Sequence, residues 1–390
     1  MSGVQLPGAT LGVMGGGQLG RMFVQAAQAM GYFTAVLDPD PTSPAGMVAH
    51  YHIETGYLDE QGLAQLMQRC GAITTEFENV PAAALESLGA YRPTAPGADA
   101  VAVCQDRLLE KAQFGRSGVP CAPHAAIDSA LQADAVPDAL FPAILKTARL
   151  GYDGKGQRAV PDRAALQEAW DALGRVPCVL EKRLPLRCEI SVIVARHPTG
   201  QTVHFPVQQN LHRDGILAVT QVPATRVSAE VQQQAVDAAM RVAASMDYVG
   251  VLCVEFFVTE DGSLVANEMA PRPHNSGHYT IDACDVSQFE LQVRTLTGLP
   301  LTAPRLHSAA VMLNLLGDLW FDEGGRPRVP DWSAVLALPG AHLHLYGKSG
   351  ARPGRKMGHL TVTAADGAQA WSTAVQAGQI LGLDLGDDPT

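Results

Sequence analysis

The sequence lacks the features that mark several large classes of protein. Its 390 residues contain seven cysteines, which are scattered singly without a CxxC pair, so a disulfide framework or a zinc site is not expected. The longest apolar runs fall far short of the roughly 18 residues that a membrane-spanning helix needs. The opening MSGVQLPGATLGVMGGG has no basic flank and breaks into glycines, so it is a poor signal peptide. These absences favour a cytoplasmic enzyme.

Positive charge is also scarce. The net charge of −11 argues against broad nucleic-acid binding, which needs a basic surface. It leaves room for a small anionic ligand held by a local basic cluster. With 47% hydrophobic and 17% charged residues the chain is expected to fold, and its length suits two or three domains. The phosphate-binding sequence GxxxxGK[ST] is absent.

The first hundred residues contain a glycine turn of the kind that precedes a helix. The stretch TLGVMGGGQLGRMFVQAAQAMGYFTAVLD predicts strand, turn, helix and strand. Gly15, Gly17 and Gly20 fit GxGxxG, and Asp38 closes the next strand. Such a turn offers free backbone N–H groups to a phosphate. The pattern alone leaves three readings open: NAD, another phosphate, or a tight turn without a ligand.

A second ligand-binding position is expected where the strand GAITTEFENV ends. In an open parallel sheet, ligands lie at the carboxyl ends of the strands. Glu76 and Asn79 are therefore candidates to hold a neutral or cationic part of the same ligand. A solvated loop with a helix cap before Pro81 is the alternative.

The middle of the chain has features of a nucleotide site. FPAILKTARLGYDGKG predicts a strand that ends on Lys146, followed by a loop with Gly151, Gly154 and Gly156. Glycines allow successive N–H groups to wrap around phosphate oxygens, and Lys146 and Lys155 would add positive charge. A strand, QRAVP, is expected to follow. An exposed hairpin tip is the alternative.

A hairpin in this region predicts a metal site. VLCVEFFVTEDGSLVANEMA reads as two strands around the turn Asp261-Gly262. A turn centred there places Glu255 opposite Glu268 and Phe256 opposite Asn267. Opposed Cβ atoms lie about 4.5–5.5 Å apart, so the two carboxylates repel unless a cation lies between them. Magnesium, which takes one or two carboxylates plus phosphate oxygens, is the expected cation. A solvent-facing pair splayed apart is the alternative.

Directly after this hairpin, NEMAPRPHNSGH crowds polar groups that no core element needs. Arg272, His274, Asn275 and His278 would surround whatever receives the phosphoryl group. They suit a small anionic acceptor such as a carboxylate or bicarbonate, because arginine binds planar oxyanions and histidine moves protons near neutral pH. A polar loop with caps is the alternative.

A second basic cluster lies near the C-terminus, in LYGKSGARPGRKMGHL. It contains no acid, and its members are Lys348, Arg352, Arg355, Lys356 and His359. On an acidic chain this predicts a local anion site for a phosphate of the acceptor substrate. A generic solvated loop is the alternative.

The order and spacing of these motifs resemble the ATP-grasp superfamily over about residues 105–297. In that superfamily two α+β lobes close on ATP and two magnesium ions. GGGQLGRM, TTEFENV, QDRLLEK, GYDGKGQ, NEMAPRPHNSGH and YGKSGARPGRKMGHL extend the resemblance over about residues 9–365. Together they resemble the N5-carboxyaminoimidazole ribonucleotide synthases, the PurK enzymes of purine biosynthesis.

The resemblance implies a fold and a reaction. Residues 1–104 would form a Rossmann-like parallel-sheet domain, 105–297 the ATP-grasp domain with a small lid lobe at about 115–182, and 298–390 a small β-rich domain. ATP would phosphorylate bicarbonate to carboxyphosphate, and the exocyclic amine of 5-aminoimidazole ribonucleotide (AIR) would then capture the carboxyl group. The resemblance further implies a cytoplasmic homodimer that uses ATP and magnesium and binds neither nucleic acid nor membrane.

It also implies residue roles. The residues expected to line the ATP site are Arg107, Lys146, Gly151, Tyr152, Asp153, Gly154, Lys155, Gly156, Gln157, Glu181, Lys182, Leu184, Glu189, His212, Asn267 and Glu268. Those expected to hold AIR are Gly17, Gln18, Leu19, Glu76, Asn79, Lys348, Arg355 and Lys356. Glu255 and Glu268 would bind magnesium. The catalytic residues expected around bicarbonate are Arg272, His274, Asn275 and Lys348.

Within these roles, Glu181 would meet the adenine edge and Glu189 the ribose of ATP. Glu76 would take the ribose or aminoimidazole end of AIR, and the GxGxxG turn would meet the AIR phosphate. The proton of the attacking amine goes to His274 or to the departing phosphate. The lobe that contains the 151–157 loop is expected to act as a lid that excludes water.

Other readings stay open. The formate-dependent glycinamide ribonucleotide transformylase belongs to the same superfamily and also makes an acyl phosphate. Biotin carboxylase fits less well because the chain is short for it. An NAD-dependent dehydrogenase rests only on GxGxxG and Asp38, and a nucleotide-binding regulator would not need Arg272, His274 and Asn275.

Overall fold

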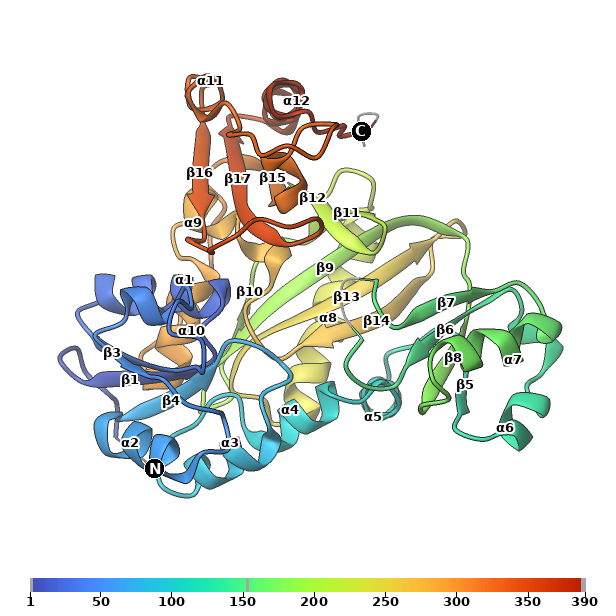
Figure 1. The fold of residues 1–390 in the computed structure, drawn as a ribbon, viewed down its shortest axis with the longest axis horizontal. Helices are drawn as coiled ribbons and strands as arrows, with labels where there is room; N and C mark the ends of the chain where they lie inside the picture. The colour runs from blue at the N-terminus through green and yellow to red at the C-terminus, as the bar shows by residue number, and fades with distance from the viewer. Residues whose placement is uncertain (1–2, 152–153, 387–390) are drawn as a thin grey trace.

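The computed structural model describes residues 3–151 and 154–386. These residues form three bodies joined by a long central sheet, with the N-terminal body in blue, a small body in green and the C-terminal body in red (Figure 1). None of the described helices is long and apolar enough to cross a membrane.

The N-terminal body is built on a parallel sheet. Within the described residues it has four strands in the order β3-β2-β1-β4. These are β1 (Thr10–Met14), β2 (Phe33–Leu37), β3 (Tyr51–Ile53) and β4 (Ala72–Thr75). Its helices are α1 (Gln18–Ala29), α2 (Glu60–Arg69), α3 (Ala82–Gly89) and the short 3-10 helix η1 (Gly46–Val48). The predicted strand–turn–helix–strand unit is confirmed. Helix α1 buries Met22, Phe23 and Ala27 in a core that also contains Phe289 and Val293 of the central part.

The glycine turn before α1 is filled by carboxylates of its own chain. The Gly16 N–H donates to Asp38 Oδ2 over 2.7 Å, and the Gly17 and Gly20 N–H groups donate to the two oxygens of Glu76 over 2.9 and 3.2 Å. A Cβ atom on Gly16 would lie 2.7 Å from Asp38 Cγ, so the close approach requires glycine. The expectation of free N–H groups is therefore wrong for these three residues.

The small green body is an antiparallel sheet with helices against it. In the described chain its four strands follow the order β5-β8-β6-β7. They are β5 (His124–Ile127), β6 (Ala143–Thr147), β7 (Gln157–Val160) and β8 (Cys178–Lys182), with α6 (Ala130–Asp134), α7 (Arg163–Ala172) and η2 (Asp138–Leu140). The strand expected after the glycine loop is confirmed as β7. This body places Lys146 and Glu181 on neighbouring strands, β6 and β8.

The central sheet runs from the nucleotide region into the C-terminal body. Over the described residues it has nine strands, eight of them in the order β14-β13-β9-β11-β12-β15-β17-β16, with β10 paired to β9. The strands are β9 (Leu186–Arg196), β10 (Thr202–His204), β11 (Gln208–Arg213), β12 (Ile216–Val222), β13 (Gly250–Thr259), β14 (Leu264–Ala270), β15 (Ala309–Leu316), β16 (Ala341–Leu345) and β17 (Lys356–Ala364). Backbone pairing of β12 with β15 makes the C-terminal strands a continuation of this sheet. The proposed domain boundary at 297/298 thus lies within a chain segment that leads back into the same sheet, and it remains a prediction.

Helices cover this sheet and connect the bodies. They are α4 (Ala98–Cys104), α5 (Arg107–Arg116), α8 (Ala229–Ser245), α9 (Thr280–Ala283), α10 (Gln288–Thr297), α11 (Trp332–Leu336) and α12 (Gly367–Leu381), with the 3-10 helices η3 (Asn275–Gly277) and η4 (Gly317–Trp320). Helix α12 packs its Trp371 and Ala374 into the C-terminal core.

The hairpin of β13 and β14 confirms one predicted pair and corrects another. Glu255 lies opposite Glu268, as expected. Phe256 lies opposite Ala266, because the register shifts by one residue after Glu255 and leaves Asn267 as a bulge. A strand normally turns alternate residues to opposite faces, and a bulge re-aims one of them. Asn267 and Glu268 therefore both line the same cleft.

Removal of the Asp38 carboxylate is expected to destabilise the N-terminal body. In Asp38→Ala the Gly16 N–H and the Tyr57 hydroxyl, which donates to Asp38 Oδ2 over 2.6 Å, lose their acceptor. Unsatisfied buried donors cost about 1–3 kcal/mol each, so thermal unfolding monitored by circular dichroism should shift down by roughly 5 °C.

Asp38→Asn retains one acceptor oxygen, so its thermal unfolding midpoint should fall by less than that of Asp38→Ala. Glu54→Ala removes an exposed carboxylate 3.8 Å from His52 and should shift the midpoint by less than about 1 °C. Equal shifts for Asp38→Ala and Glu54→Ala would show that the turn does not depend on Asp38.

Candidate active site

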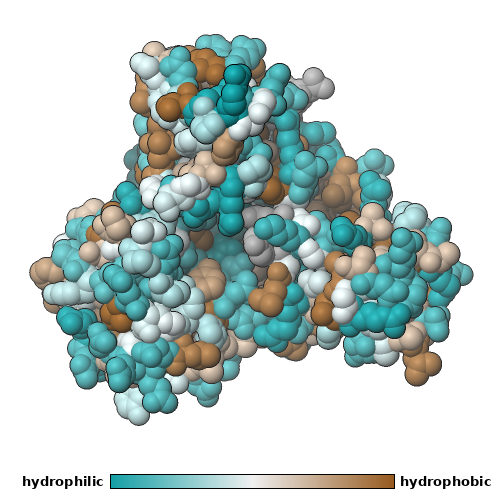
Figure 2. Space-filling model, viewed as in Figure 1, coloured by the Kyte–Doolittle hydropathy of each residue, from teal (hydrophilic) through white to brown (hydrophobic). Residues whose placement is uncertain are grey.

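Two clefts in the described part of the chain meet at the paired glutamates. The larger is about 490 Å³ and lies between the N-terminal, central and C-terminal bodies. The smaller is about 250 Å³ and lies between the small body and the central sheet. The residues that line both are Arg107, His212, Gly215, Glu255 and Glu268. Figure 2 shows a hollow with a largely hydrophilic floor where the three bodies meet.

The smaller cleft gathers most of the residues predicted to bind ATP. Those that line it are Arg107, Lys146, Gly154, Lys155, Gly156, Gln157, Glu189, His212, Asn267 and Glu268. The glycine loop reaches across to the turn between β11 and β12, where a Cβ atom on Gly154 would lie 2.6 Å from the Asp214 carbonyl oxygen. Only glycines on both sides of this contact let the two backbones approach so closely. Gly154 and Gly215 therefore meet at the wall of the smaller cleft.

Glu181 lies behind this cleft with both carboxylate oxygens in ion pairs. Lys146 Nζ is 3.0 Å from Oε2, and Lys111 Nζ is 3.1 Å from Oε1. Burial raises the pKa of Glu181, but the charges of Lys146 and Lys111 outweigh it, and the net shift is downward. The carboxylate that was expected to meet adenine is thus already held by two ammonium groups.

His212 links the smaller cleft to the glutamate pair. Its Nδ1 lies 2.8 Å from Glu189 Oε2 and its Nε2 lies 4.0 Å from Glu255 Oε2. Burial lowers the pKa of His212, but the hydrogen bond to Glu189 and the charge of Glu255 outweigh it and raise the pKa to about 9. The side chain is therefore a cation at neutral pH.

Each of the two opposed carboxylates contacts a nitrogen-bearing side chain of the protein. His274 Nε2 lies 2.9 Å from Glu255 Oε1, and Arg107 Nη1 lies 2.9 Å from Glu268 Oε2. Burial opposes the charge of Glu255, but His274 and His212 outweigh it and lower its pKa to about 2. Repulsion within the pair therefore does not by itself require a metal ion.

Asn267 supplies a separate indication of a ligand. Its Oδ1 is buried and has no hydrogen-bond partner in the structure. Buried polar atoms nearly always have a partner, so an orphaned oxygen beside two carboxylates suits a hard cation with oxygen ligands. The donor set of Glu255, Glu268 and Asn267 therefore fits magnesium.

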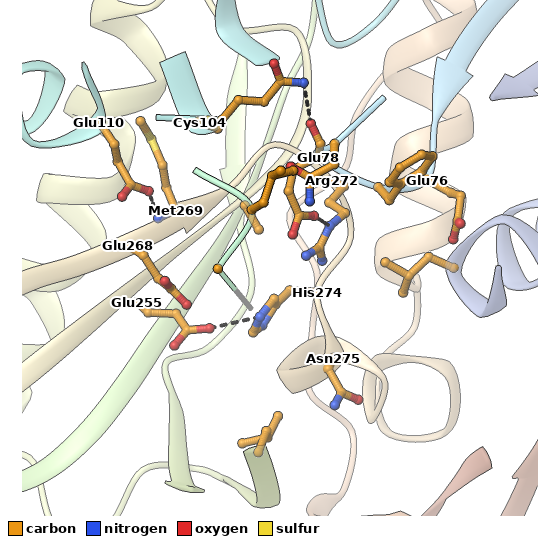
Figure 3. Close-up of a pocket in the computed structure, with 18 of the residues that line it drawn as sticks. Glu76, Glu78, Cys104, Glu110, Glu255, Glu268, Met269, Arg272, His274 and Asn275 are labelled. Carbon is orange, nitrogen blue, oxygen red and sulfur yellow. Dashed lines mark hydrogen bonds and ion pairs between the residues drawn. The ribbon is translucent and has the colours of Figure 1, made fainter. Parts of the chain in front are cut away.

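The polar segment after β14 lines the larger cleft. The Arg272 guanidinium donates to Glu78 Oε2, and Figure 3 shows Arg272 turned toward Glu78 and His274 turned toward Glu255. The amide of Asn275 is only 8% exposed, and neither its Oδ1 nor its Nδ2 has a partner. A buried amide with both polar atoms unsatisfied, in the wall of a cleft, is suited to a small polar ligand.

His278 and His359 are buried rings that lie against each other. Their rings lie 4.8 Å apart, and His278 also packs near the rings of Phe289 and Tyr346. Burial, with the charges of neighbouring cations and histidines, lowers the pKa of both rings well below the usual value, so both are neutral. The expectation that His359 adds charge to the basic cluster is wrong. His278 also lines the larger cleft.

The basic loop between β16 and β17 lies beside the start of α1. A Cβ atom on Gly347 would lie 3.3 Å from Arg21 Nη1, which shows how closely the loop approaches that helix. Lys356 lines the larger cleft together with Gln18 and Leu19. Lys348 Nζ donates to the Lys356 carbonyl over 2.8 Å. The structure thus brings the N-terminal turn and the C-terminal loop to one cleft.

Several predicted residues lie outside the lining of the two clefts. They are Gly17, Glu181, Lys182, Leu184, Lys348 and Arg355. Arg355 is held by its own loop, since its Nη1 donates to the carbonyls of Ser349 and Gly350 over 2.6 and 2.8 Å. Tyr152 and Asp153 lie outside the described residues, so their predicted role is not examined by the structure. Glu76 and Asn79 line the larger cleft, as expected from their position after β4.

Three charged residues of the site were not predicted from the sequence. Glu78 pairs with Arg272, Lys111 pairs with Glu181, and Glu110 Oε1 accepts a 2.6 Å hydrogen bond from the Met269 N–H. Glu110 and Lys111 follow Arg107 by three and four positions, so all three lie on one helix face. That spacing within QDRLLEK was a usable signal.

Comparison with known proteins agrees with this arrangement. Residues 8–105 match the family described as ribonucleotide synthetase preATP-grasp domain, 112–289 the ATP-grasp domain, and 310–373 the phosphoribosylaminoimidazole carboxylase C-terminal domain. The chain is 44% identical over 358 residues to the N5-carboxyaminoimidazole ribonucleotide synthase of Brucella melitensis, covering 91% of this chain and 96% of that protein.

Solved structures agree with the fold. An ADP complex of an N5-carboxyaminoimidazole ribonucleotide synthetase superposes with a TM-score of 0.91 at 39% identity, over 98% of this chain and 99% of that one. The Aspergillus clavatus N5-carboxyaminoimidazole synthase, in complex with ADP and AIR, gives a TM-score of 0.86 at 31% identity, over 96% of this chain and 99% of that one. The expected fold is confirmed: a preATP-grasp domain on a parallel sheet, an ATP-grasp domain and a C-terminal domain.

Glu110 is expected to make stability depend on pH. Burial raises the pKa of Glu110 to about 8, against the opposing charge of Arg107. Between its usual pKa and this value the native state holds a proton that the unfolded chain has lost, so stability falls as pH rises through that range. Glu110→Gln keeps an acceptor for the Met269 N–H without the titration. Its melting temperature should exceed that of the unaltered chain by a larger margin at about pH 8 than at about pH 5. A margin independent of pH would contradict this.

Proposed function

The chain belongs to the N5-carboxyaminoimidazole ribonucleotide synthase family, and we propose that it carboxylates AIR to N5-carboxyaminoimidazole ribonucleotide with ATP and bicarbonate, releasing ADP and phosphate. It is an ATP-dependent ligase of the ATP-grasp type. The observation that carries the proposal is the meeting of two clefts at Glu255 and Glu268, with Arg272, His274 and the unpartnered Asn275 directly beyond them.

ATP would occupy the smaller cleft. The N–H groups of the glycine loop, with Lys146 and Lys155, suit its phosphates, and Glu189 suits its ribose hydroxyls. Arg107 lines both clefts and would lie near the phosphoryl group as it passes between them. The contact of Gly154 with the β11–β12 turn supports a lid role for the loop, because it covers the cleft and excludes water.

Magnesium would be held by Glu255, Glu268 and Asn267. When bound there it supplies positive charge to the phosphate oxygens during transfer. His274 and Arg107, which now balance the two glutamates, would then be free to turn toward bicarbonate and the γ-phosphate. The number of ions, two by resemblance to the superfamily, is part of the proposal.

Bicarbonate would bind in the larger cleft against Arg272 and Asn275. Glu78 fixes the guanidinium of Arg272 and leaves part of its donor edge for a planar oxyanion. The unpartnered amide of Asn275 can give one donor and one acceptor to the same ligand. These groups would steady carboxyphosphate until the amine attacks it.

AIR would lie between the N-terminal turn and the C-terminal basic loop. Lys356, with Lys348 and Arg355 behind it, is suited to the ribonucleotide phosphate, and Gln18, Leu19, Glu76 and Asn79 line the opposite wall. Its exocyclic amine would face carboxyphosphate near His274, with His274 or the departing phosphate as proton acceptor. By resemblance we extend the proposal to a cytoplasmic homodimer in purine biosynthesis.

The structure does not support the interpretation of the chain as an NAD-dependent dehydrogenase. It rested on a glycine turn with free N–H groups and on Asp38 as a ribose ligand. The Gly16, Gly17 and Gly20 N–H groups are bonded to carboxylates, and Asp38 is occupied by Gly16 and Tyr57.

The proposed reaction is tested by phosphate release from ATP and magnesium with AIR and bicarbonate each added or withheld. We expect turnover that needs both, with one AIR consumed per phosphate released. Arg272→Ala should lower kcat/KM for bicarbonate by about 100-fold, the usual effect of losing an oxyanion donor. Stimulation by formate and glycinamide ribonucleotide instead would identify the chain as a transformylase and reject the proposal.

The metal ligands are tested by magnesium titration of the same activity. Glu268→Gln and Glu255→Gln should each raise the magnesium concentration for half-maximal rate by about tenfold or more, because each removes a charged oxygen ligand. Glu290→Gln, on the surface of α10 in a pair with Arg294, is the matched control and should leave the titration unchanged. Manganese binding followed by electron paramagnetic resonance should weaken in parallel. Unchanged metal dependence in both glutamate variants would remove them from the metal site.

A further inference from the structure

One face of helix α5 holds parts of the site that belong to different bodies. Arg107 Nη1 contacts Glu268 Oε2 at 2.9 Å and Glu110 accepts from Met269 N at 2.6 Å, both on β14 of the central sheet. Lys111 Nζ contacts Glu181 Oε1 at 3.1 Å, on β8 of the small body. The 107, 110 and 111 spacing puts all three on neighbouring positions of one face. Lys111 thus forms an ion pair between the two bodies that enclose the nucleotide cleft.

The Lys111–Glu181 pair is almost completely buried. The side chains are 1% and 5% exposed. Burying a charge is costly unless an opposite charge lies against it, and breaking a buried pair strands the remaining charge. Glu181 is therefore expected to stay paired with at least one lysine whether or not a ligand is bound.

The two lysines on Glu181 face different spaces. Lys146 lines the nucleotide cleft, together with the glycine loop. Lys111 is absent from that lining and instead borders a separate hollow with Val119, Pro120 and Lys182. A phosphate in the nucleotide cleft would therefore meet Lys146 and not Lys111.

We propose that Lys111 is a positioning residue for ATP: it stays on Glu181 and so frees Lys146 to leave that carboxylate for the phosphates. This rests on the proposed function, since it assigns ATP to the cleft of Lys146. Without Lys111, Lys146 is the sole cation on a buried carboxylate, and ATP has to compete with Glu181 for it. The downward shift of the Glu181 pKa, caused against burial by both lysines, agrees with this sharing.

The test is the affinity for a non-hydrolysable ATP analogue, measured by isothermal titration calorimetry on the full chain. Lys111→Met should weaken binding by about tenfold or more, which is about 1.4 kcal/mol. Lys111→Arg keeps the charge and should restore affinity to within about threefold. Arg116→Met is the matched control, because it also removes a cation from α5. The Arg116 guanidinium donates within that helix, to Gln113. It should change affinity by less than about twofold.

A double-mutant cycle separates this role from a general effect on folding. In a Glu181→Gln background there is no carboxylate to balance, so the further change Lys111→Met should alter analogue affinity by less than about twofold. This comparison also holds if Lys111→Met alone does not fold, since the double variant leaves no buried carboxylate without a partner. A loss of about tenfold in both backgrounds would reject the proposal, and so would Lys111→Met binding as tightly as the unaltered chain.

The outcomes distinguish this inference from the function on which it rests. If the unaltered chain does not bind the analogue, the proposed ATP-dependent function is wrong. If the unaltered chain binds it and Lys111→Met binds equally well, the function stands and the role of Lys111 is wrong. A loss confined to kcat, with ATP affinity unchanged, would also contradict a role in freeing Lys146.

Discussion

The backbone pairing of β13 with β14 sets the geometry on which the rest of the site depends. It holds the buried Glu255 directly opposite Glu268, whose side chain is 41% exposed, so two negative charges are fixed side by side. Each charge needs a partner, and the partners come from elsewhere in the chain: His274 from the segment after β14 and Arg107 from α5. The need to pair these two charges therefore positions both the segment after β14 and helix α5, which also carries Glu110 and Lys111.

Charge balance within the protein gives several cations of the site a carboxylate partner. Arg272 is paired with Glu78, Lys146 with Glu181, and His212 with Glu189. Every one of these cations is a candidate partner for a phosphate or bicarbonate oxygen. When such an anion binds, the cation exchanges its carboxylate partner for an oxygen of the ligand. Because the cation is already out of water in its first pair, the desolvation cost of binding is lower. The buried Oδ1 of Asn267 and the two amide atoms of Asn275 have no hydrogen-bond partner, so in the proposed complex they would meet a ligand without displacing a protein group.

Local patterns in the sequence predicted several of the elements and part of the cleft lining, and the family resemblance added further lining residues such as Arg107 and His212. The glycine turn, the Lys146 loop and the Glu255–Glu268 pair follow from spacing within single segments. What failed depended on contacts between distant segments. The turn N–H groups looked free because Glu76 lies 59 residues from Gly17, and His359 looked charged because its burial against His278 is set by the packing of the C-terminal body. The Asn267 bulge was missed because strand alternation says nothing of where a register shifts, although the Glu255–Glu268 pair itself was predicted correctly.

The continuity of the central sheet has a consequence for how such a site works. Strands β9 to β17 carry the hairpin of Glu255 and Glu268 at one end and the basic loop between β16 and β17 at the other, so backbone hydrogen bonds fix that loop relative to the paired glutamates. The N-terminal turn is tied to the same part of the chain through the packing of α1 on α10. The small body has its own separate sheet. It meets the rest of the chain through side-chain pairs such as Lys111–Glu181, through the contact of Gly154 with the β11–β12 turn, and through backbone contacts such as the hydrogen bond from the Arg107 N–H to the Ala148 carbonyl. The Lys111–Glu181 pair is therefore one of several contacts that place the small body relative to the paired glutamates.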